Sequence, residues 1–190
     1  PVSLYALGKG SPAAGDVDGD GNLDIVITSE SDHMYVFRAD GTTLPGWPKV
    51  VAGDAPDFGP SPSLGDLDGD GREEIVHCAV ESSPSFSYTK LYVFDASGNT
   101  LLSKSLELNS QSSPILADLD GDGGVDIVHG GEAGVLHAWN LAGQELAGFP
   151  IPPGTSIICA EVKGVGRMHP LSAEKLSPVL ALYFGDGWET

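Results

Sequence analysis

The sequence predicts an all-β fold built from repeated units of about 50 residues, and two observations support this prediction. Short segments rich in β-branched and aromatic residues alternate with glycine-containing turns, and no segment shows a helical periodicity of apolar residues. The same acidic phrase also returns at Asp16, Asp66 and Asp118, which lie 50 and 52 residues apart. Four antiparallel strands in a repeat of this length are typical of a β-propeller blade, so we expect a β-propeller.

Each repeat contains the same succession of predicted elements. A short strand after Ser-Pro precedes the acidic phrase, an Ile-Val strand follows it, and a hairpin leads to a third strand that ends in an aromatic residue. A glycine turn then leads to a fourth strand, which ends in Gly-aromatic-Pro in the first and third repeats. We place the first blade at about residues 11–53, the second at about 59–109 and the third at about 112–151.

The two ends of the chain are predicted to supply a composite fourth blade, made of about residues 154–190 with 1–8. The loop near residue 164 has Lys163 and Val165 where aspartates are expected, so we predict that it binds no metal. Joining the two ends would close a four-bladed ring in a monomer, or an eight-bladed ring in a strand-exchanged homodimer. A segment of a longer propeller remains the alternative.

The acidic phrase has the composition of a metal-binding loop, with carboxylates at positions 1, 3, 5 and 9 and glycines at positions 4 and 6. Glycine allows the positive φ angles that a tightly curled loop needs, and converging carboxylates repel each other unless a cation lies between them. Hard oxygen ligands suit Ca²⁺ best, so we predict three calcium sites. The predicted ligand positions 1, 3, 5, 7 (through its backbone carbonyl) and 9 are Asp16, Asp18, Asp20, Asn22 and Asp24; Asp66, Asp68, Asp70, Arg72 and Glu74; and Asp118, Asp120, Asp122, Gly124 and Asp126.

These loops are not EF-hands. An EF-hand has a bidentate Glu at position 12 and a helix on each side, whereas position 12 here is Ile27, His77 or His129 within a short β-branched segment. The predicted loops therefore join two strands, and the last carboxylate comes from position 9. We expect both histidines to lie in the core.

Composition narrows the classes of partner. The chain of 190 residues carries 9 Lys+Arg against 27 Asp+Glu, a formal net charge of -18, which argues against binding nucleic acid or an anionic membrane. No apolar run approaches the ~20 residues of a membrane-spanning helix, so we expect no membrane insertion. Because loops of this kind usually need the millimolar calcium found outside cells, we expect a secreted or cell-surface protein.

The repeats resemble blades of the FG-GAP/VCBS type, which occur in integrin α-subunit heads and in many secreted bacterial proteins. The resemblance covers about residues 11–151 and depends on the triple D-x-D-G-D-G-x-x-[DE] match. Phe58-Gly59 matches the Phe-Gly of the family name, whereas the Gly-Ala-Pro half is not retained. The resemblance implies a calcium loop between the first and second strands of each blade. It also implies a role in adhesion, in glycan binding, or as a module attached to an enzyme.

We therefore expect a non-catalytic module that binds a glycan or an extracellular protein. The sequence contains no G-x-S-x-G, no H-E-x-x-H and no phosphate-binding glycine loop. Two alternatives stay open: part of a secreted polysaccharide lyase or other enzyme, and a structural spacer. The candidate ligand-binding residues are Phe86 and Tyr88, two aromatic side chains in a long hairpin on the face opposite the acidic loops.

Overall fold

The computed structural model describes residues 8–29, 33–51, 60–82, 87–106, 112–131 and 134–153, together with Leu4 and Ser110. All the regular elements in these ranges are β-strands. Three antiparallel sheets contain them, and the prediction of an all-β fold is confirmed. The first sheet comprises β1 (Gly8–Gly15), β2 (Asp24–Ser29), β3 (His33–Phe37) and β4 (Lys49–Val50); the second comprises β5 (Ser63–Gly65), β6 (Glu74–Ser82), β7 (Ser87–Phe94) and β8 (Thr100–Ser105); and the third comprises β9 (Ile115–Ala117), β10 (Asp126–Gly130) and β11 (Leu136–Trp139).

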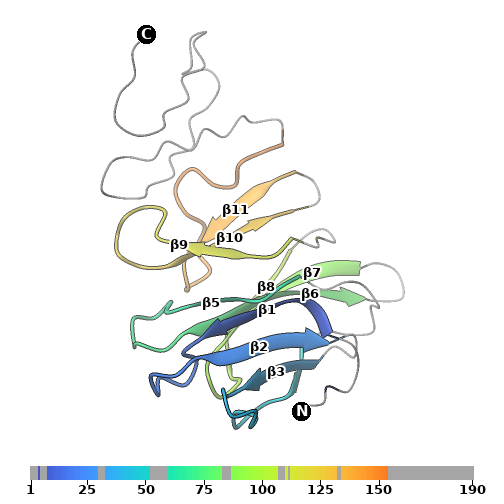
Figure 1. The fold of residues 1–190 in the computed structure, drawn as a ribbon. Helices are drawn as coiled ribbons and strands as arrows, with labels where there is room; N and C mark the ends of the chain where they lie inside the picture. The colour runs from blue at the N-terminus through green and yellow to red at the C-terminus, as the bar shows by residue number, and fades with distance from the viewer. Residues whose placement is uncertain are drawn as a thin grey trace, which may run out of the picture.

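Strands that follow each other in the chain pair with each other in every sheet. The first two sheets have the orders β1-β2-β3-β4 and β5-β6-β7-β8, as expected for four-stranded blades. The third sheet has three strands, and Ile151 forms a single bridge with Leu136 where the fourth strand was expected. The sheets stack face to face in chain order, and the first strands β1, β5 and β9 lie next to one another (Figure 1).

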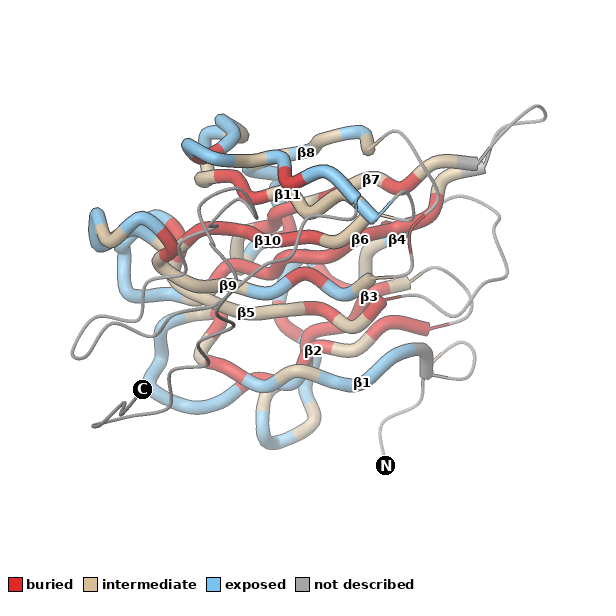
Figure 2. Tube along the Cα trace, turned by 90° about the horizontal axis from the view of Figure 1, so that it is seen from above, coloured by how far each residue is buried: buried red, intermediate tan, exposed pale blue. Residues whose placement is uncertain are grey.

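The middle strand of the second sheet, β6, is buried on both faces because this sheet packs between the other two. In β6, every residue from Glu74 to Val80 is buried. Figure 2 shows similar burial along most of β10, whereas β2 is buried less evenly, with Ile25 44% exposed, and β8 at the outer edge is largely exposed. The Ile-Val segments after each acidic loop thus form the centre of each sheet, with alternate side chains directed to opposite faces.

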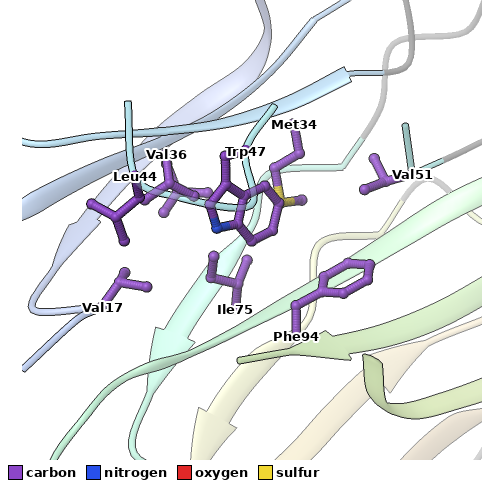
Figure 3. Close-up of a cluster of buried hydrophobic side chains, with 9 residues drawn as sticks. Val17, Met34, Val36, Leu44, Trp47, Val51, Ile75 and Phe94 are labelled. Carbon is purple, nitrogen blue, oxygen red and sulfur yellow. The ribbon is translucent and has the colours of Figure 1, made fainter. Parts of the chain in front are cut away.

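An apolar core joins the first sheet to the second. Trp47 packs edge-on against Phe94, with ring centroids 5.9 Å apart, and its Nε1 donates a hydrogen bond of 2.9 Å to the carbonyl oxygen of Ala96. Val36 of β3 and Ile75 of β6 lie in the same cluster, which Figure 3 shows between the two sheets. A second cluster joins the second sheet to the third; it contains Leu67, Val76, Cys78, Leu91, Val93, Ile127 and Trp139.

The repeated Ser-Pro pairs form a hydrogen-bond ladder between sheets. The backbone N–H of Ser11 donates to Oγ of Ser61, and the N–H of Ser61 donates to Oγ of Ser113, at 2.8 Å in both cases. The proline after each serine has no backbone N–H, so it cannot compete as a donor for the serine Oγ. The motif therefore aligns neighbouring first strands.

The predicted composite fourth blade lies outside the described residues, apart from Leu4 and Gly8. Ring closure and the blade boundaries stay predictions. No helix that could span a membrane is found among the residues that the structure describes.

Candidate functional site

The three acidic loops occupy the same place in each sheet, between the first and second strands. We call them loop 1 (residues 16–24), loop 2 (residues 66–74) and loop 3 (residues 118–126). The glycines at positions 4 and 6 have positive φ angles in all three; in loop 1 these are 74° at Gly19 and 85° at Gly21. The sequence prediction of a curled loop that depends on these glycines is confirmed.

Backbone N–H groups hold the carboxylates in place. In all three loops, position 1 accepts a hydrogen bond from the N–H of position 6, position 3 from that of position 5, and position 5 from that of position 7. In loop 1, for example, Gly21 N lies 2.9 Å from Oδ2 of Asp16, and Asn22 N lies 2.8 Å from Oδ1 of Asp20. These local bonds use the side chain to fold the loop on itself.

Carboxylates converge in each loop, although the sets differ. In loops 2 and 3 the carboxylates of positions 1, 3 and 5 approach one another, with one oxygen of each within 4.8 Å of the others. In loop 1 the set is Asp16, Asp18 and Asp24, from positions 1, 3 and 9. The structure therefore brings together three of the four predicted carboxylates in each loop. Asp20, Glu74 and Asp126 lie outside these clusters, and Asn22, Arg72 and Gly124 contribute the backbone N–H bonds described above.

The buried carboxylate at position 9 links the end of each loop to its beginning. Asp24, Glu74 and Asp126 are 2%, 3% and 3% exposed, and each accepts a hydrogen bond from the N–H of position 2. Burial is the largest cause that raises the pKa of all three, and the other loop carboxylates add to it. A buried anion of this kind needs compensating charge or hydrogen bonds.

Loop 1 has an unpaired oxygen that a cation could fill. Oδ1 of Asp16 is buried and has no hydrogen-bond partner. The matching oxygens of Asp66 and Asp118 accept hydrogen bonds of 2.7 Å and 2.6 Å from Gly69 and Gly121. The donor set contains only oxygen atoms, which suits a hard divalent cation, so the residues present fit a metal ion.

Sequence reasoning missed Arg38, which lies against loop 1. Its Nη2 lies 2.7 Å from Oδ2 of Asp18, and this interaction raises the pKa of the guanidinium. Asp95 and Asn140 occupy the same place after the third strands of the other two sheets. The only sequence feature that points to Arg38 is its position directly after a predicted strand. That position does not indicate that the following turn reaches loop 1.

Tyr88 lies near the start of β7, at the end of the second sheet away from loop 2, and its hydroxyl group is engaged within the sheet. It donates a 2.6 Å hydrogen bond to Oε2 of Glu81, and Tyr92 donates to the other oxygen of the same carboxylate. Lys90 lies 3.7 Å from Glu81 and above the ring of Tyr92. Phe86 lies outside the described residues. The proposed ligand site is therefore described only through the half-buried Tyr88 and its neighbours.

The two histidines at position 12 are buried, as expected. His77 and His129 are 3% and 1% exposed, and burial lowers the pKa of each to about 4. Nδ1 of His77 and both ring nitrogens of His129 have no hydrogen-bond partner. His137, which pairs with His129 across the strands, further lowers the pKa of His129, whereas the backbone of Ser112 acts in the opposite direction.

Comparison with known proteins identifies the repeat. Residues 16–77, from the start of loop 1 to His77, match the family model of the FG-GAP-like repeat. The resemblance stated from the acidic phrases is thereby confirmed for these residues.

Among solved structures, the chain is similar to the crystal structure of BBS1N in complex with ARL6DN, soaked with lead, at a TM-score of 0.50 and 14% identity, covering 82% of this chain and 46% of that one. This likeness supports a β-propeller-like arrangement of the sheets and nothing about function. The chain is also similar, at a TM-score of 0.36 and 19% identity, to the V. cholerae biofilm matrix protein Bap1, covering 77% of this chain and 30% of that one. That similarity is too distant to bear on function.

A short stretch resembles a curated enzyme. The chain is 58% identical over 38 residues to an aldehyde-alcohol dehydrogenase of Streptococcus pneumoniae serotype 4, which is 20% of this chain and 4% of the enzyme. The chain thus spans a very small share of the curated relatives it matches, and the matched stretch is shorter than one repeat. We take no activity from it.

Proposed function

From the FG-GAP-like repeat that the chain carries at residues 16–77, we propose a calcium-stabilised module for binding in the extracellular space. Loops 1, 2 and 3 would each hold one Ca²⁺. The observation that carries the proposal is the convergence of three carboxylates in every loop, with one oxygen of each within 4.8 Å of the others, on the same edge of three successive sheets. The unpaired Oδ1 of Asp16 supports it for loop 1.

Calcium fits these loops better than other common metal ions. The clustered ligands are carboxylates without cysteine or histidine, whereas zinc sites favour nitrogen and sulfur. Magnesium demands near-ideal octahedral geometry and keeps several waters, and an irregular set of protein oxygens suits the larger ion. When bound, Ca²⁺ would supply the positive charge that offsets the buried carboxylates at position 9.

The role proposed for the calcium ions is structural. Three divalent ions would offset six of the 18 net negative charges of the chain and hold the loops between paired strands. A fold that is stable only in millimolar calcium suits the extracellular space, where we place the protein.

The binding function is proposed for the face opposite the acidic loops, with Phe86 and Tyr88 as the candidate contacts and a glycan or an extracellular protein as the ligand. Aromatic rings at an exposed edge stack on sugars or fill pockets of a partner. The alternatives are part of a secreted enzyme and a structural spacer.

Two measurements test these proposals. Isothermal titration of the chelator-treated protein with CaCl₂ is expected to give three binding events, with MgCl₂ as the control; absence of heat with both salts would reject the metal assignment. A glycan array compares the wild type with the Phe86→Ala, Tyr88→Ala double variant. Loss of array signal at unchanged melting temperature supports the ligand face, and a signal that survives in the variant contradicts it.

A further inference from the structure

Glu73 brings a third carboxylate to the junction between the first and second sheets. It occupies position 8 of loop 2, and a Cβ atom built on Gly15 would lie 1.6 Å from its Oε2. Its carboxylate therefore lies against the residue that precedes loop 1. The backbone N–H of Glu73 also donates to the carbonyl oxygen of Asp16, at 3.1 Å.

The carboxylates of Glu73, Asp16 and Asp66 act on one another at this junction, and the side chain of Arg72 lies beside Gly19 of loop 1. Burial, followed by the carboxylates of Asp16 and Asp66, raises the pKa of Glu73. Among the described residues, no hydrogen bond or ion pair reaches the Glu73 side chain. The neighbouring Oδ1 of Asp16 is buried and also unpaired. The Glu73 carboxylate therefore lies unpaired at the seam between the two sheets, where the Asp16 carboxylate repels it.

The next junction provides a neutral comparison. Val125 occupies position 8 of loop 3, and its Cγ1 would lie 3.8 Å from a Cβ built on Gly65. The two junctions share the same architecture, since leucine side chains at matching positions, Leu64 and Leu116, would each lie 3.0 Å from those Cβ atoms. They differ in having a carboxylate in one case and an apolar side chain in the other.

We propose that Glu73 couples the metal occupancy of loop 1 to the contact between the first and second sheets. The inference rests on the calcium binding proposed above. With a cation in loop 1, the negative charge of Glu73 is attracted to the loop, and the two sheets are held together. Without it, Glu73 and Asp16 repel each other across the seam. The junction at Val125 lacks this dependence.

The test uses the full chain and exchanges the residues of the two junctions. Glu73→Gln removes the charge and keeps the shape, Glu73→Val introduces the residue of the other junction, and Val125→Glu is the reciprocal variant. Thermal melting in EGTA and in CaCl₂, together with calcium titration calorimetry, is measured for each protein.

We expect both Glu73 variants to melt above the wild type in EGTA and to gain less from calcium. The affinity of one of the three sites should fall about tenfold, because a divalent ion loses an attractive unit charge nearby. Val125→Glu should melt below the wild type in EGTA and gain more from calcium. If the wild type responds to calcium and the Glu73 variants respond equally, the coupling is rejected while calcium binding stands. If the wild type itself does not respond, both proposals are rejected.

Discussion

Nζ of Lys49 lies 4.9 Å from the ring centroid of Phe94, and so links the outer strand of the first sheet to the third strand of the second. The same ammonium group donates to the carbonyl oxygen of Gly98. Lys104 repeats this contact one sheet later: it lies 5.1 Å from the ring centroid of Trp139 and 3.1 Å from the oxygen of Gly143. Ile151 stands at the matching place after the third sheet. The lysine contact thus joins the sheets at both described junctions.

Replacing either lysine should weaken the junction between sheets. Lys49→Met and Lys104→Met keep most of the apolar side chain and remove both the cation–π contact and the hydrogen bond. We expect each to lower the free energy of unfolding by about 1–2 kcal/mol, measured by urea denaturation in calcium. Lys90→Met, which alters a contact within one sheet, serves as the comparison. Equal effects of all three variants would contradict a specific role between sheets.

Gly46 should tolerate alanine far less than a glycine of the same backbone conformation. Its φ angle is +94°, as is that of Gly123. A Cβ on Gly46 would lie 2.1 Å from the backbone oxygen of Ser97, whereas nothing lies within 4 Å of one on Gly123. Both substitutions carry a conformational cost of about 1–2 kcal/mol, and the clash adds about 2 kcal/mol or more at Gly46 only. Urea unfolding of the two variants in calcium measures the difference; equal losses would contradict the close contact.

The repeat and its acidic loops could be predicted from the sequence because they depend on local features. Fixed spacing of carboxylates and glycines determines the loop, and short β-branched and aromatic segments between glycine turns identify the strands. The contacts of Arg38, Lys49 and Glu73 could not be predicted, because they depend on how the turns and sheets lie relative to one another. The engagement of Tyr88 by Glu81 depends on hairpin register, which the sequence leaves open.

Acid should destabilise the protein through its two buried histidines. The pKa of His77 and His129 is about 4 in the folded chain and 6.5 as the ordinary value, so the unfolded chain takes up protons first as the pH falls. Their stabilising contribution is fully present above pH 6.5 and is lost as the pH approaches 4. Between pH 7 and 5 each histidine should account for a loss of about 2 kcal/mol.

Leucine variants test this pH dependence. His77→Leu and His129→Leu should each reduce the difference in unfolding free energy between pH 7 and pH 5, measured by urea denaturation in saturating calcium. His137→Leu, a change at a half-buried histidine in the same sheet as His129, is the control and should leave most of the difference. An unchanged difference in both buried-site variants would assign the acid sensitivity to other groups.

Arg38 should weaken calcium binding at loop 1. Its guanidinium lies 2.7 Å from Oδ2 of Asp18, so it competes with a cation for that carboxylate. Asn140 occupies the matching position after the third strand of the third sheet and carries no charge. Arg38→Asn should therefore raise the affinity of one calcium site several-fold, and Asn140→Arg should lower the affinity of another by a similar factor, since each changes one unit of charge near a divalent ion.

Calorimetric titration at low and high salt measures both changes. Because these charges are partly exposed, screening should reduce the two effects at high salt. Opposite changes in the two variants would support competition by the charge at this position. If Arg38→Asn instead weakens binding, the ion pair with Asp18 orders loop 1 for the cation rather than competing with it.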